Sequence, residues 1–148
     1  MSSPDRHRPR AHDMMTRHPM VVHAEDDAEP LLALFEAHDF NAMPVLDAED
    51  HLVGVVTKLS LLRLFRGGSA TRSAEAGSPA TLRVRDVMDT RKVWVEPADD
   101  LDAVVRQMTR YHVRSVPVVE RSERRHRLVG IVSRGDLLRG TAQPPASA

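Results

Sequence analysis

The chain has 148 residues, with 21 Lys and Arg balanced by 21 Asp and Glu, so its formal net charge is zero. This balance gives no support to a general binder of nucleic acids or of anionic membranes. The chain has no cysteine, which excludes disulfides, thiolate metal sites and a cysteine nucleophile.

Both ends of the chain, residues 1–10 and 141–148, are predicted to be disordered tails. Prolines, charges and small residues leave these segments little to bury. Residues 1–10 also lack the apolar stretch of a secretory signal. No apolar run approaches the roughly 18 residues that a membrane span needs. We therefore expect a cytoplasmic protein with no membrane partner.

Residues 11–66 are predicted to form a β-α-β-β-α unit. Asp26 or Asp27 is expected to cap its first long helix, with Asp26 and Glu29 at the spacing of a capping box. Apolar residues follow at the i, i+3, i+4 and i+7 positions of a core-facing helix, namely Ala28, Leu31, Leu32 and Phe35. The other expected elements are a helical turn at 11–16, strands at 20–22, 42–46 and 52–56, and a helix at 58–65.

A linker rich in Gly and Ser, residues 67–81, shows no apolar periodicity. The pattern then restarts over residues 82–140. A helix capped by Asp99 or Asp100 carries the same apolar spacing, at Leu101, Val104, Val105 and Met108. The other expected elements are a helical lead-in at 84–88, strands at 93–95, 116–119 and 128–132, a charged turn at 120–127, and a helix at 134–139.

The two segments are copies of one repeat. An offset of 73 carries seven residues of the first copy onto identical residues of the second, among them Met15 and Pro44. After the hairpin turn an offset of 76 does the same for seven more, among them Gly54 and Leu62. A unit of about 60 residues is marginal alone. We therefore expect the copies to share a core and the chain to form a homodimer.

Each copy ends in a strand-to-helix corner that begins with a hydroxyl, Thr57 in the first and Ser133 in the second. A helix N-terminus presents free backbone N–H groups and the positive end of the helix dipole, which favour anions. A hydroxyl there can donate to a phosphate oxygen, and a carboxylate one turn on can accept two hydrogen bonds from a ribose diol. Among the corner residues, only Asp136 offers that charge. The alternative is that Ser133 and Asp136 simply cap the last helix.

This pattern resembles a tandem pair of cystathionine-β-synthase (CBS) domains, a Bateman module. The resemblance rests on Met43-Pro44-Val45-Leu46-Asp47 with Gly54–Ser60, and on Val116-Pro117-Val118-Val119-Glu120 with Gly130–Asp136. It implies an α+β fold of two β-α-β-β-α repeats, related by a pseudo-two-fold and packed through their sheets. It also implies a homodimer and clefts for AMP, ADP or ATP, with S-adenosylmethionine or NAD(H) as further possibilities.

In such proteins one repeat supplies the corner of each pocket, and the other supplies its first strand and the residues before its proline. The resemblance assigns the main site to Thr16, Met20, Phe40, Asn41, Ala42, Ile131, Ser133, Arg134 and Asp136. It assigns a second site to Val55, Thr57, Ser60, Thr90, Val93, Val113 and Arg114. Ser60 replaces the expected aspartate, so we expect the second site to bind weakly or stay empty.

Other functions have weaker support. The arginines between Glu120 and Leu128 alternate with glutamates and have no aromatic neighbour, which favours a solvated turn over a nucleic-acid surface. No histidine pair has the i, i+4 spacing of a helical metal site. We therefore expect no metal. The chain has no Gly-x-Ser-x-Gly motif, Walker loop, His-Glu-x-x-His motif or spaced carboxylate pair, so we also expect no enzyme activity. The sequence predicts a stand-alone CBS pair that senses an adenosine-containing ligand and regulates a partner protein. The alternative is a ligand-independent dimerisation or adaptor module.

Overall fold

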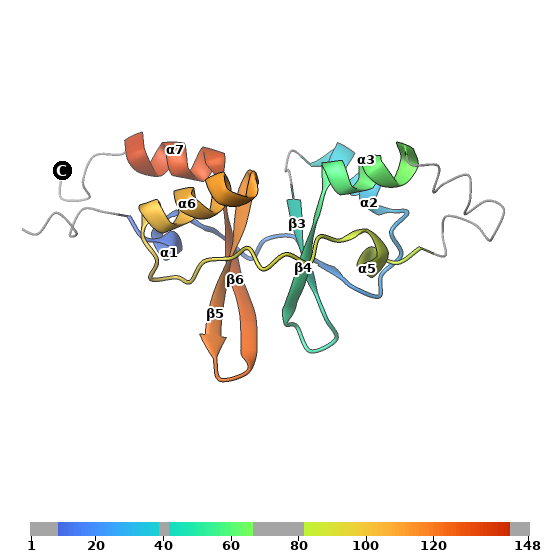
Figure 1. The fold of residues 1–148 in the computed structure, drawn as a ribbon, viewed down its shortest axis with the longest axis horizontal. Coiled ribbons are helices and arrows are strands. Elements are labelled where there is room, and N and C mark those ends of the chain that lie inside the picture. The colour runs from blue at the N-terminus through green and yellow to red at the C-terminus, as the bar shows by residue number, and fades with distance from the viewer. Residues whose placement is uncertain (1–8, 39–41, 67–81, 143–148) are drawn as a thin grey trace, which may run out of the picture. The chain divides into compact units, whose positions relative to one another are not determined.

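The computed structural model describes residues 9–38, 42–66 and 82–142. The chain forms two compact units. The continuous unit comprises Met20–Lys92, and the split unit joins Met1–Pro19 to Val93–Ala148. Each unit has a three-stranded sheet and its own helices, labelled in Figure 1. This confirms the predicted α+β class.

The sheet of the continuous unit has the strand order β2-β3-β4. Strand β2 pairs in parallel with β3, and β3 pairs antiparallel with β4. Leu31 and Phe35 of helix α2 share one buried core with Met43 and Val45 of β3. The elements of this unit are β2 (Val22–His23), α2 (Leu31–Ala37), β3 (Ala42–Leu46), β4 (Leu52–Thr57), α3 (Lys58–Arg66) and α5 (Val84–Val87).

The sheet of the split unit has the strand order β1-β6-β5, and both pairings are antiparallel. Helix α6 buries Val104 and Met108 against Val116 and Val118 of β5. Helices α6 and α7 lie at one end of the β5–β6 hairpin and its turn lies at the other (Figure 1). The elements are α1 (Ala11–Met14), β1 (Thr16–Arg17), α6 (Leu101–Tyr111), β5 (Ser115–Ser122), β6 (Arg125–Ser133) and α7 (Arg134–Ala142).

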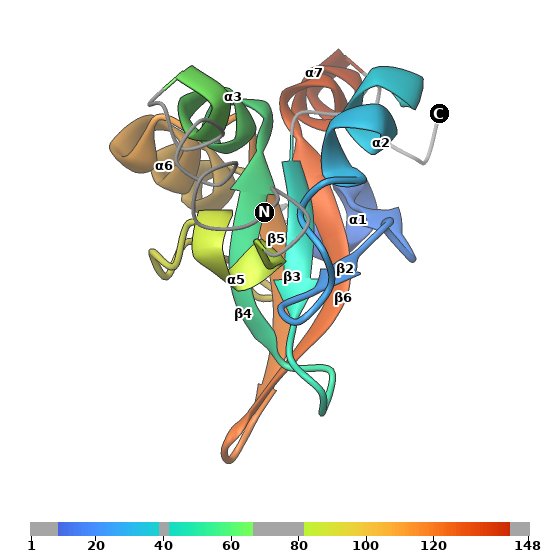
Figure 2. The same cartoon turned by 90° about the vertical axis from the view of Figure 1, so that its right-hand side faces the viewer.

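The two lead-in helices, α1 and α5, are exchanged between the repeats: each packs in the unit that contains the sheet of the other repeat. Helix α5 is the first element of the second repeat, yet it packs in the continuous unit beside β4 (Figure 2). There the Val84 N–H donates to the Asp26 carbonyl at 2.8 Å, and Val55 and Asp89 exchange two backbone hydrogen bonds. Helix α1 is the first element of the first repeat but packs in the split unit, where the Ala11 N–H donates to the Asp99 carbonyl at 2.7 Å.

The glycine of each corner strand lies where the lead-in segment crosses that strand. A Cβ atom on Gly130 would lie 2.9 Å from the Thr16 carbonyl oxygen, and one on Gly54 would lie 2.9 Å from that of Asp89. Real side chains do not approach a backbone oxygen so closely. The glycines found in both copies therefore permit close backbone approach.

The predicted helix stripes were wrong at one position, which is the same in both copies. Leu32 is 37% exposed and Val105, its equivalent at an offset of 73, is 43% exposed. Both residues hold the i+4 position, which lies at one edge of the predicted stripe, about 40° around the helix from the i position. The buried side of each helix runs instead through the i+3 and i+7 positions, Leu31 and Phe35 in α2 and Val104 and Met108 in α6.

The predicted cap of α6 is confirmed, and the predicted cap of α2 is wrong. Asp100 caps α6, because its Oδ1 accepts a hydrogen bond from the Ala103 N–H at 3.0 Å. Neither Asp26 nor Asp27 caps α2, which begins at Leu31 after Pro30, with no side-chain cap. The Asp26 carboxylate instead accepts from the His23 N–H at 2.9 Å, so it holds the turn before the helix.

Three strand predictions needed correction. The predicted strand at 93–95 reduces to one bridge between Val95 and Val118. The predicted turn at 120–127 mostly continues the hairpin, since the ladder extends to the Ser122–Arg125 pair. The predicted strand at 20–22 begins only at Val22. Strand β1 was not predicted, because two residues are too few to show an alternating pattern.

Candidate functional site

The corner between β6 and α7 is fixed by a reciprocal pair of hydrogen bonds. The Ser133 N–H donates to Asp136 Oδ2 at 2.9 Å, and the Asp136 N–H donates to Ser133 Oγ at 3.2 Å. This is the capping-box arrangement that satisfies free N–H groups at a helix start. Asp136 is only 6% exposed and is the one buried charged residue in the described part of the chain. Ser133 and Asp136 therefore cap α7, and their role toward a ligand stays a prediction.

The second oxygen of the same carboxylate has a different partner. Asp136 Oδ1 pairs with Nη2 of Arg139, one turn further along α7. The Arg139 side chain is 69% exposed, so the pair joins a buried carboxylate to a guanidinium at the surface. Arg139 was not predicted as a residue of this corner, although an i, i+3 spacing of Asp and Arg in a helix is a recognisable signal.

The corresponding corner of the continuous unit has the same geometry without charge. Thr57 Oγ1 and Ser60 Oγ lie 2.9 Å apart, and the Ser60 N–H donates to Thr57 Oγ1 at 3.1 Å. Ser60 therefore takes the structural place of Asp136 as a cap. It brings no carboxylate for a ligand diol.

Part of the predicted main site comes together within the split unit. Strand β1 places Thr16 directly opposite Ile131, two residues before Ser133 in β6. The Arg134 N–H donates to the Arg114 carbonyl oxygen at 3.0 Å. Five predicted main-site residues belong to this unit: Thr16, Ile131, Ser133, Arg134 and Asp136.

The remaining predicted site residues are distributed over both units. Met20 and Ala42 of the main site belong to the continuous unit, with Val55, Thr57, Ser60 and Thr90 of the second site. Within that unit Ala42 pairs with Thr57. Val113, Arg114 and Val93 belong to the split unit, where Val93 is 7% exposed and part of the core. Phe40 and Asn41 lie outside the described residues, and assembly of either complete site stays a prediction.

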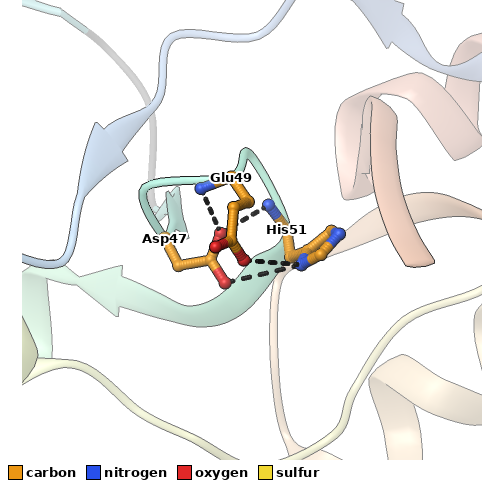
Figure 3. A group of neighbouring side chains, drawn as sticks. All are labelled: Asp47, Glu49 and His51. Carbon is orange, nitrogen blue, oxygen red and sulfur yellow. Dashed lines mark hydrogen bonds and ion pairs between the residues drawn. The ribbon is translucent and has the colours of Figure 1, made fainter. Parts of the chain in front are cut away.

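A second polar group lies at the turn between β3 and β4. Ligand atoms of Asp47, Glu49 and His51 all lie within 4.8 Å of one another (Figure 3). Asp47 Oδ1 accepts from the backbone N–H groups of Glu49 and His51 at 2.8 and 2.9 Å. Asp47 Oδ2 lies 3.5 Å from His51 Nδ1. These turn hydrogen bonds and the ion pair are sufficient to bring the three side chains together.

The same contacts make a prediction about acid stability. The backbone N–H of His51, with further help from the Glu49 N–H and the charge of His51, lowers the pKa of Asp47 below its ordinary value of 3.8. A carboxyl whose pKa is lower in the folded state stabilises the fold above its unfolded pKa, and this contribution is lost as pH falls through the folded value. Asp47→Asn should therefore cost stability at pH 7 and progressively less below pH 4. Urea unfolding at several pH values measures this, and a pH-independent difference would contradict it.

The arginine-rich hairpin carries charges of both signs. Glu120 lies opposite Arg127 in the β5–β6 ladder, and Arg121, Arg124 and Arg125 are exposed.

Within the described ranges, no helix is both long and apolar enough to cross a membrane.

Comparison with known proteins gives consistent matches. The family model of the CBS domain matches residues 11–67 and 84–142. The crystal structure of CBSX2 in complex with AMP is 27% identical, with a TM-score of 0.74, and the match covers 90% of this chain and 96% of that one. An uncharacterized protein of Methanocaldococcus jannaschii is 23% identical over 85% of this chain and 87% of its own length. The inosine-5'-monophosphate dehydrogenase of the same organism is 24% identical over 93% of this chain, which spans only 25% of that enzyme.

Proposed function

The chain belongs to the CBS-domain family, and from this premise we propose that it is a regulatory module that binds an adenosine-containing ligand at the Asp136 corner. AMP, ADP and ATP are the first candidates, with S-adenosylmethionine and NAD(H) next. The complex of the related CBSX2 with AMP supports this class of ligand. The dehydrogenase is matched over only a quarter of its length, which fits a regulatory part better than a catalytic one.

The observation that carries the proposal is the buried carboxylate at the start of α7. Asp136 is 6% exposed and lies one helical turn from the Ser133 hydroxyl. A ribose diol donates hydrogen bonds, and a carboxylate is the acceptor that binds it most strongly. The Ser133 hydroxyl and the N-terminal end of α7 favour a phosphate beside the sugar. Thr16, opposite Ile131 in the sheet, is the lead-in residue assigned to this site.

Regulation follows from a ligand that prefers one conformation of the CBS pair. Such a ligand shifts the population toward the conformation that it binds more tightly, by as much as its affinities differ. A partner protein that contacts the same surface in only one conformation would then sense the ligand. The sign of regulation depends on whether that partner prefers the conformation that the ligand binds or the other one.

Asp136→Asn should weaken binding of AMP or ATP about tenfold to a hundredfold. This range corresponds to the roughly 1.5–3 kcal/mol of a hydrogen bond to a charged group. Asparagine keeps an oxygen for the Ser133 N–H, so the helix cap survives and the loss reports the charge. Isothermal titration calorimetry measures both affinity and stoichiometry, and thermal unfolding checks that the variant is folded.

A substitution that adds the carboxylate to the other corner is the matched gain-of-function variant. Ser60→Asp places a carboxylate in the uncharged corner of the other copy, so binding should rise from one site per chain toward two. Two equal sites in the unaltered protein, or unchanged affinity in Asp136→Asn, would refute the proposed assignment.

A ligand-independent dimerisation module is the second candidate function. Leu62 of α3 is 50% exposed, and its equivalent in α7, Leu138, is 70% exposed. Exposed leucines at equivalent positions are suited to contact a second copy of the chain. Thermal unfolding separates the two functions, because a ligand at about 100 times its Kd stabilises by roughly 2.7 kcal/mol. A dimer in sedimentation with no adenine-nucleotide effect would favour the adaptor.

A further inference from the structure

Arg139 occupies a carboxylate oxygen that the proposed ligand needs. Asp136 Oδ2 already accepts from the Ser133 N–H, and this bond belongs to the fold because it caps α7. The other oxygen, Oδ1, is paired with Arg139. A ribose diol therefore meets a carboxylate with one oxygen held by the backbone and the other held by a side chain.

The guanidinium of Arg139 also lies over the first turn of α7. Its Nη1 is 3.5 Å from the position of a Cβ on Gly135, and Ser133 Oγ is 3.7 Å from the same point. The arginine therefore lies folded back along the helix, over Gly135 and toward the hydroxyl and the carboxylate. The group that covers the corner is thus attached to the same helix and needs no partner chain.

The pair is strong enough to compete with a ligand and weak enough to be displaced. Burial of Asp136 to 6% exposure raises the benefit of a nearby cation, whereas the 69% exposure of Arg139 lets water and salt screen it. An exposed side chain at the end of a flexible stem can rotate away without disturbing the helix. Releasing Arg139 leaves the Ser133–Asp136 cap intact.

We propose that Arg139 is a built-in competitor of the ligand, which rests on Asp136 in the free protein and must leave when the ribose binds. This inference rests on the proposed function and adds to it a residue that sets affinity and makes binding salt-dependent. The uncharged nucleoside adenosine is the suitable probe, because it has the ribose diol but no phosphate for Arg139 to attract.

Arg139→Gln should bind adenosine about two- to fivefold more tightly, the equivalent of a pair worth a few tenths to 1 kcal/mol. Raising the salt concentration should tighten adenosine binding to the unaltered protein, by screening the pair, and should leave Arg139→Gln unchanged. In an Asp136→Asn background the Arg139 substitution should have no further effect. Arg63→Gln is the matched control, since Arg63 is the sequence equivalent of Arg139 in the copy that has Ser60.

Titration calorimetry of the four variants at low and high salt gives a decisive result. Unchanged or weaker adenosine binding in Arg139→Gln would overturn the inference alone, because the proposed function would survive it. An equal gain in Arg63→Gln would also overturn it, by showing a general charge effect. If no adenosine-containing ligand binds to either the unaltered protein or Arg139→Gln, the proposed function fails and the inference fails with it.

Discussion

Val84→Asp is expected to unfold the continuous unit and to spare the split unit. Val84 is fully buried in the core that contains Leu31, Met43 and Leu61, although in the sequence it belongs to the second repeat. An uncompensated charge in a core costs on the order of 3–5 kcal/mol. Hydrogen exchange under native conditions should show loss of protection in β3 and β4 and retention in β5 and β6.

The reciprocal substitution is the control. Ala11, the equivalent of Val84 at an offset of 73, is fully buried in the core of the split unit. Ala11→Asp should therefore expose amides of β5 and β6 first, although Ala11 belongs to the first repeat. The exchange of lead-in helices would be contradicted if each variant lost protection in the strands of its own repeat, or if both variants lost protection in both units alike.

Gly130→Ala should destabilise the split unit by about 1–3 kcal/mol, the usual cost of overpacking a close-packed site. The added Cβ would lie 2.9 Å from the Thr16 carbonyl oxygen and closer still to the Met15 side chain. The methionine can move, but the backbone oxygen belongs to a strand paired with β6. Urea denaturation measures the loss, and cleavage of residues 9–19 by protease should accelerate.

Gly135→Ala provides the matched control only five residues away. The nearest atom to a Cβ at that position is Arg139 Nη1, at an ordinary contact distance of 3.5 Å. Because alanine is the better helix former, this variant should gain about 0.5–1 kcal/mol. Equal effects of the two substitutions would show that loss of glycine flexibility, and not the crossing of β1, decides the stability.

Much of the local structure was predictable because it depends on short-range spacing. The strand–turn–strand patterns around Pro44 and Pro117 give β3–β4 and β5–β6, and the hydroxyl-led corners give α3 and α7. The Ser133–Asp136 pair is also local, since four consecutive residues at a helix start suffice to form it. The predicted family is confirmed by the match over both repeats.

The misses share a physical cause, which is that the deciding partner lies far along the chain. Strand β1 exists only because β6 offers an unpaired edge to Thr16 and Arg17. Val95 has one strand neighbour, Val118, so an apolar triplet that suggests a strand forms only a bridge. The exposure of Leu32 depends on which side of α2 the sheet covers.

The sequence by itself determined the duplication, the order of the elements in each copy and the place of the one charged corner at Asp136. Only the tertiary structure decided that each lead-in helix completes the core of the other copy. The reason is that Ala11 and Val84 are small apolar residues, and the sequence pattern is equally consistent with their burial in either core. Their choice is made by backbone hydrogen bonds to Asp99 and Asp26, which exist only once the chain has folded back on itself.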